Sequence, residues 1–593
     1  MTNGHCLITA CPGSGKTFVL RERAVRKLKE DRKACGIAVT FTKDAAKEIE
    51  NRVFQAYPEA AGRLTCGTFH SLCMRQLKDA GIKVNLVNDV AKFDLIKRAW
   101  KDVVHECDGV LLADAALFIE KMKSTVHPAT SDPGSCLLSA IFYRYQELLK
   151  QIGAMDFSDM LVLATQGMPS GRVPLVPGSF LLVDEAQDSD SVQMGWVYAY
   201  MEKGVEVTVV GDDDQSLYSF RFGNGFASLE AFRTKARATH ISLDTTYRCA
   251  HEIILPAAKL IKLNVDRIDK HLKTENLNPG VVRRFTAKDQ EEEIAQLVKT
   301  ILATDTPGDW GILVRTNKLA DKIEKGVAQQ FPISRNKGKS FWDERIPAIF
   351  LGLVRSIWFD DLVGVDGILR LAGVTESRLS VIHRQFRSSE RGSLSAYLKS
   401  GGAAADSIEG KFRSMAEAWK RLLIKERHQL ACEGMGNYIY SLNLADGISD
   451  KSKPIYLQVC RNQLVAASSA VVNMRGSMAN RLNTLAREQD EEAKKKRMEA
   501  ARKEADLKDG KSVDDGVDEP IPTAKLMTFH GSKGLEFKNI WMFGCDEGVI
   551  PSTKGAPLEE ERRLFYVGMT RAKQLLVISH SKKPSPFFAE CGL

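Results

Sequence analysis

The stretch "HCLITACPGSGKT", residues 5–17, restricts the possible folds more than any other part of this sequence. An apolar run comes first, a glycine-rich loop follows, and the residues from about Lys16 onward favour a helix. The loop resembles the pattern G-x-x-x-x-G-K-[ST], with Ala10 in the place of the first glycine. This order of strand, loop and helix predicts an α/β fold with a phosphate-binding loop.

Main-chain N–H groups in such a loop can surround phosphate oxygens. We therefore predict a nucleotide site along the loop, where Lys16 would reach the terminal phosphates and Thr17 would bind Mg²⁺. A chance glycine-rich turn is the alternative, but it does not explain a strand before the loop and a helix after it. The loop residues of this predicted site are Ala10, Pro12, Gly13, Ser14 and Gly15.

A second stretch, "SFLLVDEAQDSDSVQ" at residues 179–193, supplies acidic groups for the same chemistry. Its apolar run ends at Asp184 and Glu185, and ligands of open α/β sheets bind where the strands end. Asp184 suits the Mg²⁺ site, and Glu185 suits a base that orients the attacking water. The alternative is a helix N-cap with solvated acids.

A third stretch, "GDDDQSLYSFR" at residues 211–221, combines two kinds of side chain. The acids and Gln215 suit a metal–phosphate site. Tyr218, Phe220 and Arg221 suit stacking on nucleic-acid bases. We expect this segment to connect a nucleotide site with a strand of nucleic acid.

The order of sequence patterns indicates two α/β regions, each interrupted by helices. "AVTFTKDAAKEIENRV" predicts a strand, a turn and a helix. The second helical region ends in a charged run that predicts an exposed helix, with a flexible linker from Lys508. We expect the first α/β domain at 1–71 and 154–240, its helical insertion at 72–153, the second α/β domain at 241–349 and 516–593, and its insertion at 350–515.

Composition adds little to these motifs. The chain has 593 residues, which is too many for one core, and its net charge of +9 permits a nucleic-acid partner without requiring one. Its twelve cysteines are scattered, so we expect a reducing, intracellular location. We expect this location to be the cytoplasm of a bacterium or, for a virus-encoded chain, of its host cell. We expect neither a signal peptide nor a membrane span.

Nine sequence blocks, in order, resemble the UvrD/Rep/PcrA family of superfamily 1 helicases. They are "ACPGSGKT", "AVTFTKDAAKEI", "GTFHSL", "LLVDEAQDSD", "VVGDDDQSLYSFR", "TTYR", "ILVRTN", "LMTFHGSKGLEF" and "EEERRLFYVGMTRAK". The resemblance implies two RecA-like P-loop motor domains with ATP and Mg²⁺ between them. It also implies an ATP-dependent 3′-to-5′ helicase or translocase that moves on single-stranded DNA and acts on tailed duplexes. Protein partners in repair or replication stay open.

The resemblance implies further roles at the nucleotide. Gln215 would sense the γ-phosphate and the attacking water. Arg248 and Arg571 would be arginine fingers that stabilise charge on the transferring phosphoryl group. Tyr247 would pack on the adenine, and Glu536 would contact the ribose.

The resemblance also implies a DNA track that runs through several motifs. For each aromatic residue the alternative is a place in the core. The residues implied are Phe41, Thr42, Phe69, His70, Tyr218, Phe220, Arg221, Arg315, Asn317, Phe341 and His530.

The sequence departs from the family pattern near the base of the nucleotide. None of the nine residues before Ala10 is the glutamine that reads adenine in the family. Phe18 stands where the family commonly has an arginine against the base, and Phe220 stands in place of a tryptophan. Selectivity for ATP over GTP is therefore open.

The sequence is also compatible with three alternatives to a helicase. A translocase could strip proteins from single strands and unwind little. A motor subunit of a helicase–nuclease would need a nuclease on another chain. A P-loop protein that only binds DNA would not need Glu185, Gln215, Arg248 and Arg571 together.

Overall fold

The computed structural model describes most of the chain. The described residues are 4–104, 109–125, 136–217, 223, 225–304, 306–327, 330–331, 333–335, 341–386, 393–400, 404, 406–442, 444–445, 453–474, 476–485, 523–553 and 557–593. The charged run and linker predicted after residue 485 lie outside these ranges.

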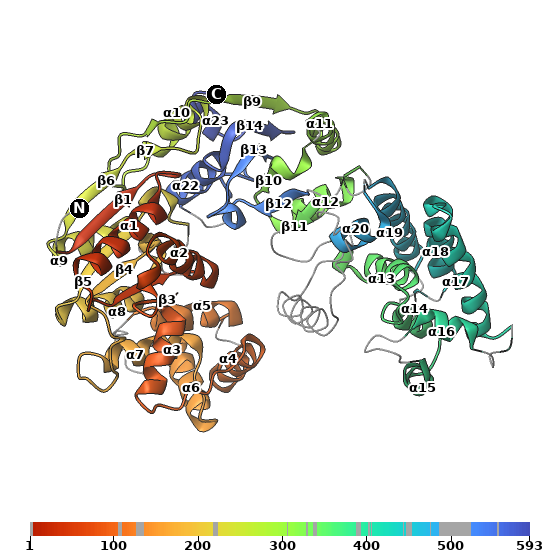
Figure 1. The fold of residues 1–593 in the computed structure, drawn as a ribbon, viewed down its shortest axis with the longest axis horizontal. Coiled ribbons are helices and arrows are strands. Elements are labelled where there is room, and N and C mark those ends of the chain that lie inside the picture. The colour runs from red at the N-terminus through yellow and green to blue at the C-terminus, as the bar shows by residue number, and fades with distance from the viewer. Residues whose placement is uncertain are drawn as a thin grey trace. The chain divides into compact units, whose positions relative to one another are not determined.

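The chain divides into two compact units (Figure 1), and each is described by itself. Unit 1 comprises Met1–Val282, Ile550–Leu575 and Pro586–Leu593, and unit 2 comprises Arg283–Val549 and Leu576–Ser585. Unit 1 contains one whole six-stranded sheet, unit 2 contains most of a second sheet, and each unit has a group of helices. The four domain boundaries expected from the sequence stay a prediction.

The sheet of unit 1 has six strands in the order β3-β2-β4-β5-β1-β6. All five pairings are parallel, so every strand ends at the same edge. The strands are β1 (Cys6–Ala10), β2 (Gly36–Thr40), β3 (Leu64–Thr68), β4 (Phe180–Val183), β5 (Glu206–Gly211) and β6 (Thr239–Leu243).

The apolar strands of this sheet are covered on both faces, as in parallel sheets generally. Leu7 and Val209 pack into one hydrophobic cluster, whereas Ile8 and Val210 pack into another. The helices of this α/β part are α1 (Lys16–Glu30), α2 (Lys43–Ala56), α3 (Phe69–Asp79), α7 (Phe157–Gly167), α8 (Ser191–Glu202) and α9 (Gly225–Lys235). The strands and helices predicted around residues 6–30 and 36–56 are confirmed.

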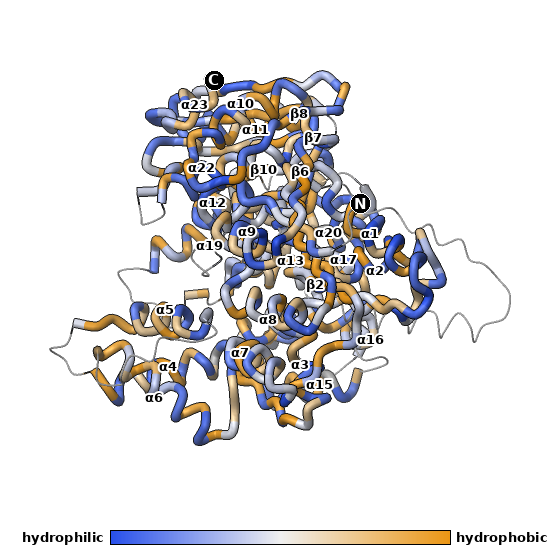
Figure 2. Tube along the Cα trace, turned by 90° about the vertical axis from the view of Figure 1, so that its left-hand side faces the viewer, coloured by the Kyte–Doolittle hydropathy of each residue, from blue (hydrophilic) through white to orange (hydrophobic). Residues whose placement is uncertain are grey.

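Three further helices of unit 1, α4 (Asp89–Val103), α5 (Leu112–Lys123) and α6 (Leu137–Gln151), form a small core of their own. Their traces alternate between hydrophobic and hydrophilic stretches (Figure 2), which is the pattern of amphipathic helices. The chain here is helical, as the sequence predicts.

The remaining elements of unit 1 surround its C-terminal segments. Helix α10 packs on α22 and α23, and α22 also packs on the short helix η3 that follows β5. These elements are η1 (Pro58–Ala60), η2 (Ala186–Asp188), η3 (Asp213–Gln215), β7 (Thr245–Thr246), α10 (His251–Ile261), β8 (Lys273–Thr274), α22 (Leu558–Met569) and α23 (Phe587–Cys591).

The second sheet has the order β11-β12-β10-β13-β14-β9. Strands β9 (Val281–Thr286) and β14 (Ala572–His580) cross the boundary between the units within their own length. The other strands are β10 (Trp310–Val314), β11 (Ile333–Arg335), β12 (Ala524–Thr528) and β13 (Phe537–Met542). Beside them lie α11 (Gln290–Ala303), η5 (Pro307–Asp309), α12 (Asn317–Val327), η6 (Phe341–Asp343) and η7 (His530–Ser532).

A helical region with one large hydrophobic cluster completes unit 2. Its helices are α13 (Arg345–Phe359), α14 (Val365–Leu371), α15 (Glu376–Phe386), α16 (Leu394–Lys399), α17 (Ile408–Ile424), α18 (His428–Ser441), α19 (Lys453–Asn473) and α20 (Met478–Leu485). The predicted architecture, with α/β parts interrupted by mainly helical insertions, is confirmed.

Candidate nucleotide site and DNA-contact residues

The glycine-rich loop connects β1 to α1 with two glycines in the left-handed region. Gly13 has φ 73° and Gly15 has φ 85°, conformations that other L-residues adopt only with strain. Helix α1 begins at Lys16 and carries no acid in its first turn. The hydroxyl of Ser14 is buried and has no hydrogen-bond partner among the described residues. A helix N-terminus and a buried hydroxyl without a partner fit an anion at this loop.

Two acidic groups stand at the same edge of the sheet because β4 is parallel to β5 and β5 to β1. Lys16 Nζ lies 3.0 Å from Glu185 Oε1. Glu185 has φ 52°, an uncommon backbone conformation for a residue other than glycine. Its main-chain N–H donates to Asp184 Oδ1 at 3.0 Å. The acids are therefore not a solvated helix cap, since Glu185 pairs with the loop lysine.

The charges at this edge shift each other's pKa values. Burial, together with the neighbouring Glu185 carboxylate, raises the pKa of Asp184 to about 7. Burial alone would lower the pKa of Lys16, but Glu185, Asp212 and Asp184 outweigh it and raise that pKa. A divalent cation next to Asp184 would favour its ionised form. The Asp184 carboxylate and the Thr17 hydroxyl are oxygen donors, the kind of ligand that Mg²⁺ prefers.

The segment that follows β6 lies directly against the glycine-rich loop. Tyr247 N–H donates to Gly13 O at 2.9 Å. A Cβ added at Gly13 would lie 2.4 Å from Arg248 Cβ and 2.9 Å from Thr246 Oγ1. Tyr247 and Arg248, predicted from a distant motif, are therefore beside the predicted phosphate site.

Gln215 and Arg571 contact each other within unit 1. Arg571 Nη2 donates to Gln215 Oε1 at 2.8 Å, and Arg571 Nε donates to Val567 O at 2.9 Å. Burial and the nearby Arg248 guanidinium lower the pKa of Arg571 to about 9. Arg248 Nη1 donates to Thr570 O at 3.4 Å. The structure thus brings Gln215 and both predicted arginine fingers together.

Two aromatic side chains near the loop are exposed. Tyr247 is 65% exposed and Phe18 is 52% exposed. The guanidinium of Arg21 lies 4.5 Å from the Phe18 ring centroid. Arg21 is not among the site residues predicted from the sequence. Its position one turn after Phe18 on a predicted helix is the signal that could have identified it. Arg21 supplies a positive charge next to the ring at residue 18.

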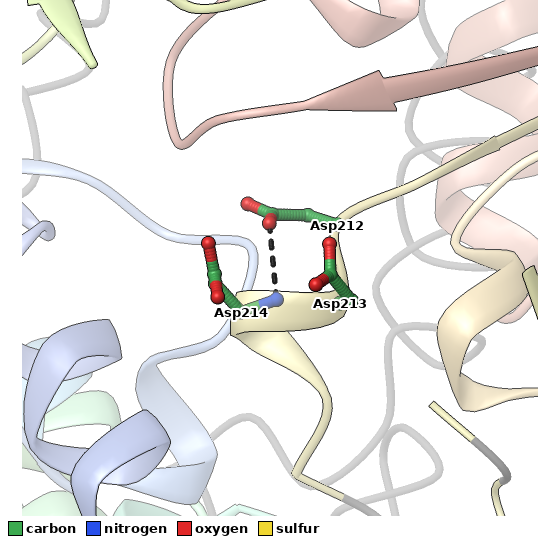
Figure 3. A group of neighbouring side chains, drawn as sticks. All are labelled: Asp212, Asp213 and Asp214. Atoms are coloured by element: carbon green, nitrogen blue, oxygen red, sulfur yellow. Dashed lines mark hydrogen bonds between the residues drawn. The ribbon is translucent and has the colours of Figure 1, made fainter. Parts of the chain in front are cut away.

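A second missed group follows β5. Lys270 Nζ lies 2.6 Å from Asp212 Oδ1, 2.8 Å from Asp213 Oδ1 and 2.9 Å from Asp214 Oδ2. Arg267 donates to both oxygens of Asp214 at 3.0 Å. Figure 3 shows the three carboxylates on one short turn. The only sequence signal for Arg267 and Lys270 is that these two basic residues are three positions apart.

The predicted DNA-contact residues of unit 1 have different environments. Thr42 caps α2, since its Oγ1 accepts from Ala45 N. His70 is half-buried, and its ring centroid lies 5.8 Å from that of Phe157 in an edge contact. Phe41 is half-buried and directly follows the last residue of β2. Tyr218, Phe220 and Arg221 lie outside the described residues.

The structure does not support a strand contact for two of the predicted aromatics. Phe69 is 3% exposed and packs edge-on against Trp196 in the core of unit 1. Phe341 is also 3% exposed and belongs to the hydrophobic cluster of the helices of unit 2. Rings buried in this way present no face to a base. The core alternative holds for both in this structure.

In unit 2, three predicted DNA contacts share one sheet edge. Strands β10 and β12 are parallel with Val314 opposite Thr528, so both end at the same level. Arg315 follows β10, Asn317 begins α12, and His530 begins η7 just after β12. Glu536 is exposed and precedes β13, which places it at the opposite edge of this sheet.

Two properties of the described residues concern the predicted absence of a membrane span and the predicted reducing location. Among the described residues, no helix is both long and apolar enough to cross a membrane. None of the eleven cysteines in the described ranges forms a disulfide bond.

Comparison with known proteins finds two domains of one helicase family in this chain, one in its N-terminal part and one in its C-terminal part. Residues 1–236 match the UvrD/REP helicase N-terminal domain, and residues 419–583 match the UvrD-like helicase C-terminal domain. DNA helicase II of Haemophilus influenzae is 26% identical over 646 residues, covering 99% of this chain and 85% of the relative. The ATP-dependent DNA helicase PcrA of Staphylococcus aureus is 26% identical over 618 residues, covering 98% of this chain and 82% of the relative.

DNA helicase II of Salmonella typhimurium matches to the same degree, at 26% identity over 625 residues. These alignments run along nearly the whole chain and agree with the two family matches. The nine sequence blocks, the parallel sheets and the phosphate loop are consistent with them. The chain therefore belongs to the UvrD/Rep/PcrA-like family of ATP-dependent DNA helicases.

Proposed function

We propose that this chain hydrolyses ATP at the edge of the unit 1 sheet and uses that energy to move 3′-to-5′ on single-stranded DNA and separate duplexes. The observation that carries the proposal is the set of groups at that edge. Lys16 pairs with Glu185, and Gln215 bonds to Arg571. Binding DNA would not by itself require a base, an amide sensor and two arginines.

Nucleotide binding would rearrange the ion pair in the loop. The main-chain N–H groups around Gly13 and Gly15 would bind phosphate oxygens, and Lys16 would turn from Glu185 to the terminal phosphates. Thr17 and Asp184 would hold Mg²⁺, which shields the negative charge of the phosphates. The Glu185 carboxylate, released from Lys16, would then orient the attacking water and accept its proton.

The arginines would act on the charge that develops during phosphoryl transfer. Arg571 has a lowered pKa and donates to neutral oxygens such as Gln215 Oε1 and Val567 O. A cation in such a buried place is stabilised when a negative group arrives. Arg248, half-buried next to Gly13, would approach the same phosphates. Both would stabilise the transition state.

On the base side, Tyr247 and Phe18 would stack on the purine. Both rings are exposed in this structure, and Arg21 lies over the Phe18 ring. Stacking of this kind does not read the exocyclic groups of the base. Glu536 stays a proposed ribose contact.

The DNA strand would contact the second sheet through Arg315, Asn317 and His530, and unit 1 through Phe41, Thr42 and His70. The three residues of unit 2 share one strand edge, which favours a common ligand. The names of the relatives support DNA as that ligand and ATP as the fuel. No observation favours a translocase that does not unwind, or a nuclease complex.

Two variants test the hydrolytic assignment. We expect Lys16→Ala to lose ATP hydrolysis through lost phosphate binding. Glu185→Gln should bind ATP yet lose turnover by roughly two orders of magnitude or more, because the amide cannot accept the proton. Steady-state ATP hydrolysis with single-stranded DNA, together with binding of labelled ATP, measures both. Near-wild-type turnover in Glu185→Gln would remove the assignment of the base.

A further inference from the structure

The three aspartates after β5 resemble a metal site, but an ammonium group occupies their centre. The three carboxylates lie close together on one short turn (Figure 3). One oxygen of each lies within 4.8 Å of the others, and all three residues are at most 1% exposed. Lys270 Nζ lies 2.6 to 2.9 Å from one oxygen of each. Lys270 is itself 1% exposed. The cluster is therefore a buried ion-pair network rather than a place for Mg²⁺.

This network is bonded directly to Gln215. Asp212 accepts from Lys270 with Oδ1 and from Gln215 Nε2 with Oδ2 at 2.5 Å. Gln215 Oε1 then accepts from Arg571. A carboxylate only accepts and a guanidinium only donates, so these two partners determine which way the amide points. Lys270, Asp212, Gln215 and Arg571 form one continuous chain of contacts.

The same network joins the segment after α10 to the turn after β5. Lys270 follows α10, the helix that begins just after Tyr247 and Arg248. Ile268 N–H donates to Asp213 Oδ2 at 2.6 Å, and Arg267 binds Asp214. The segment after α10 is thus attached at several points to the turn that carries Gln215.

We propose that Lys270 is a positioning residue for ATP hydrolysis, which holds Asp212 so that Asp212 orients the Gln215 amide. The inference rests on the proposed function, since it takes Gln215 to act on the γ-phosphate. Without the ammonium group, repulsion between buried carboxylates would turn the Asp212 side chain. The Gln215 amide would then lose the acceptor that orients its Nε2.

The test compares Lys270→Met with Arg267→Met. Both remove a buried cation from the same segment, but Arg267 binds Asp214 at both carboxylate oxygens, whereas Lys270 donates to the carboxylate that holds Gln215. With saturating single-stranded DNA, we expect kcat for ATP to fall about tenfold or more in Lys270→Met and by less than about twofold in Arg267→Met. Affinity for a non-hydrolysable ATP analogue should stay within about threefold in both.

A second comparison uses the Gln215→Ala background. If Lys270 acts through Gln215, adding Lys270→Met to Gln215→Ala should lower kcat by less than about twofold further. Equal losses in the Lys270 and Arg267 variants, or losses that multiply with Gln215→Ala, would overturn the inference and leave Lys270 a structural residue.

Two further outcomes separate this inference from the proposed function. Wild-type turnover in Gln215→Ala would remove the proposed role of Gln215 itself. Lost turnover in Gln215→Ala with wild-type turnover in Lys270→Met would overturn only the role of Lys270. If Lys270→Met does not fold, Asp212→Asn replaces it, because it keeps the size of the side chain. The inference predicts the same loss of kcat there, and wild-type kcat would contradict it.

Discussion

At the scale of single residues, the site is a set of buried or half-buried charged groups that contact one another and their neighbours. Glu185 holds Lys16, and Arg571 is buried with a lowered pKa. Burial in such surroundings costs free energy unless an opposite charge arrives. ATP would supply that charge. The residues that carry the chemistry are therefore buried charges whose present contacts a bound nucleotide would change.

Arg571 gives the first prediction at this scale. We expect Arg571→Ala to keep ATP affinity within a few fold and to lower turnover by about 10³ or more, because an arginine finger acts on the transition state. ATP binding and single-turnover hydrolysis separate the two effects, and thermal unfolding checks that the variant folds. A loss of affinity with unchanged turnover would make Arg571 a ground-state ligand.

The purine base gives the second. If Tyr247 and Phe18 only stack on it, GTP should support turnover within about tenfold of ATP, since differences in stacking are worth about 1 kcal/mol. The ratio of kcat/KM for the two nucleotides measures this. A preference for ATP above a thousandfold would show that hydrogen bonds read the adenine.

At the scale of elements, the strand ends were predictable and the side-chain environments were not. The strand before the phosphate loop, the helix from Lys16 and the acids after β4 follow from local patterns, because apolar runs and glycines act over a few residues. Phe69 and Phe341 show the limit. The sequence of a motif does not show whether its aromatic residue faces DNA or packs in the core, as Phe69 packs against Trp196.

Lys270 shows the same limit in another way. It is 55 residues from Gln215 in the sequence and reaches it only through Asp212. A long-range network of this kind leaves no periodic pattern, so it becomes visible only once the turn after β5 and the segment after α10 lie together. Arg571 was found because it belongs to a recognisable block.

The contact between the phosphate loop and the 246–248 segment gives a prediction at this scale. Gly13→Ala would place a Cβ 2.4 Å from Arg248 Cβ and also strain a positive φ. We expect it to lower both stability and ATP turnover, the latter at least tenfold, by displacing Arg248. Gly62→Ala is the control, since Gly62 has φ 75° and nothing within 4 Å. It should cost about 1 kcal/mol of stability and leave turnover unchanged. Similar turnover in the two variants would remove the role of this contact.

At the scale of the whole molecule, two units each combine α/β structure with a group of helices. Unit 1 carries nearly every residue assigned to the nucleotide, whereas Arg315, Asn317 and His530 belong to unit 2. The family match covers segments of both units. The central claim is therefore that hydrolysis in one part of the chain produces directed movement along a strand.

Strand separation on tailed duplexes tests that claim most directly. The same labelled duplex would carry a 3′ single-stranded tail, a 5′ tail or no tail, and strand release and ATP consumption would be followed together. The account predicts ATP-dependent release from the 3′-tailed duplex, little release from the other two, and none with Glu185→Gln. Release that prefers the 5′ tail would contradict the polarity, and ATP consumption without release from any duplex would contradict the helicase activity.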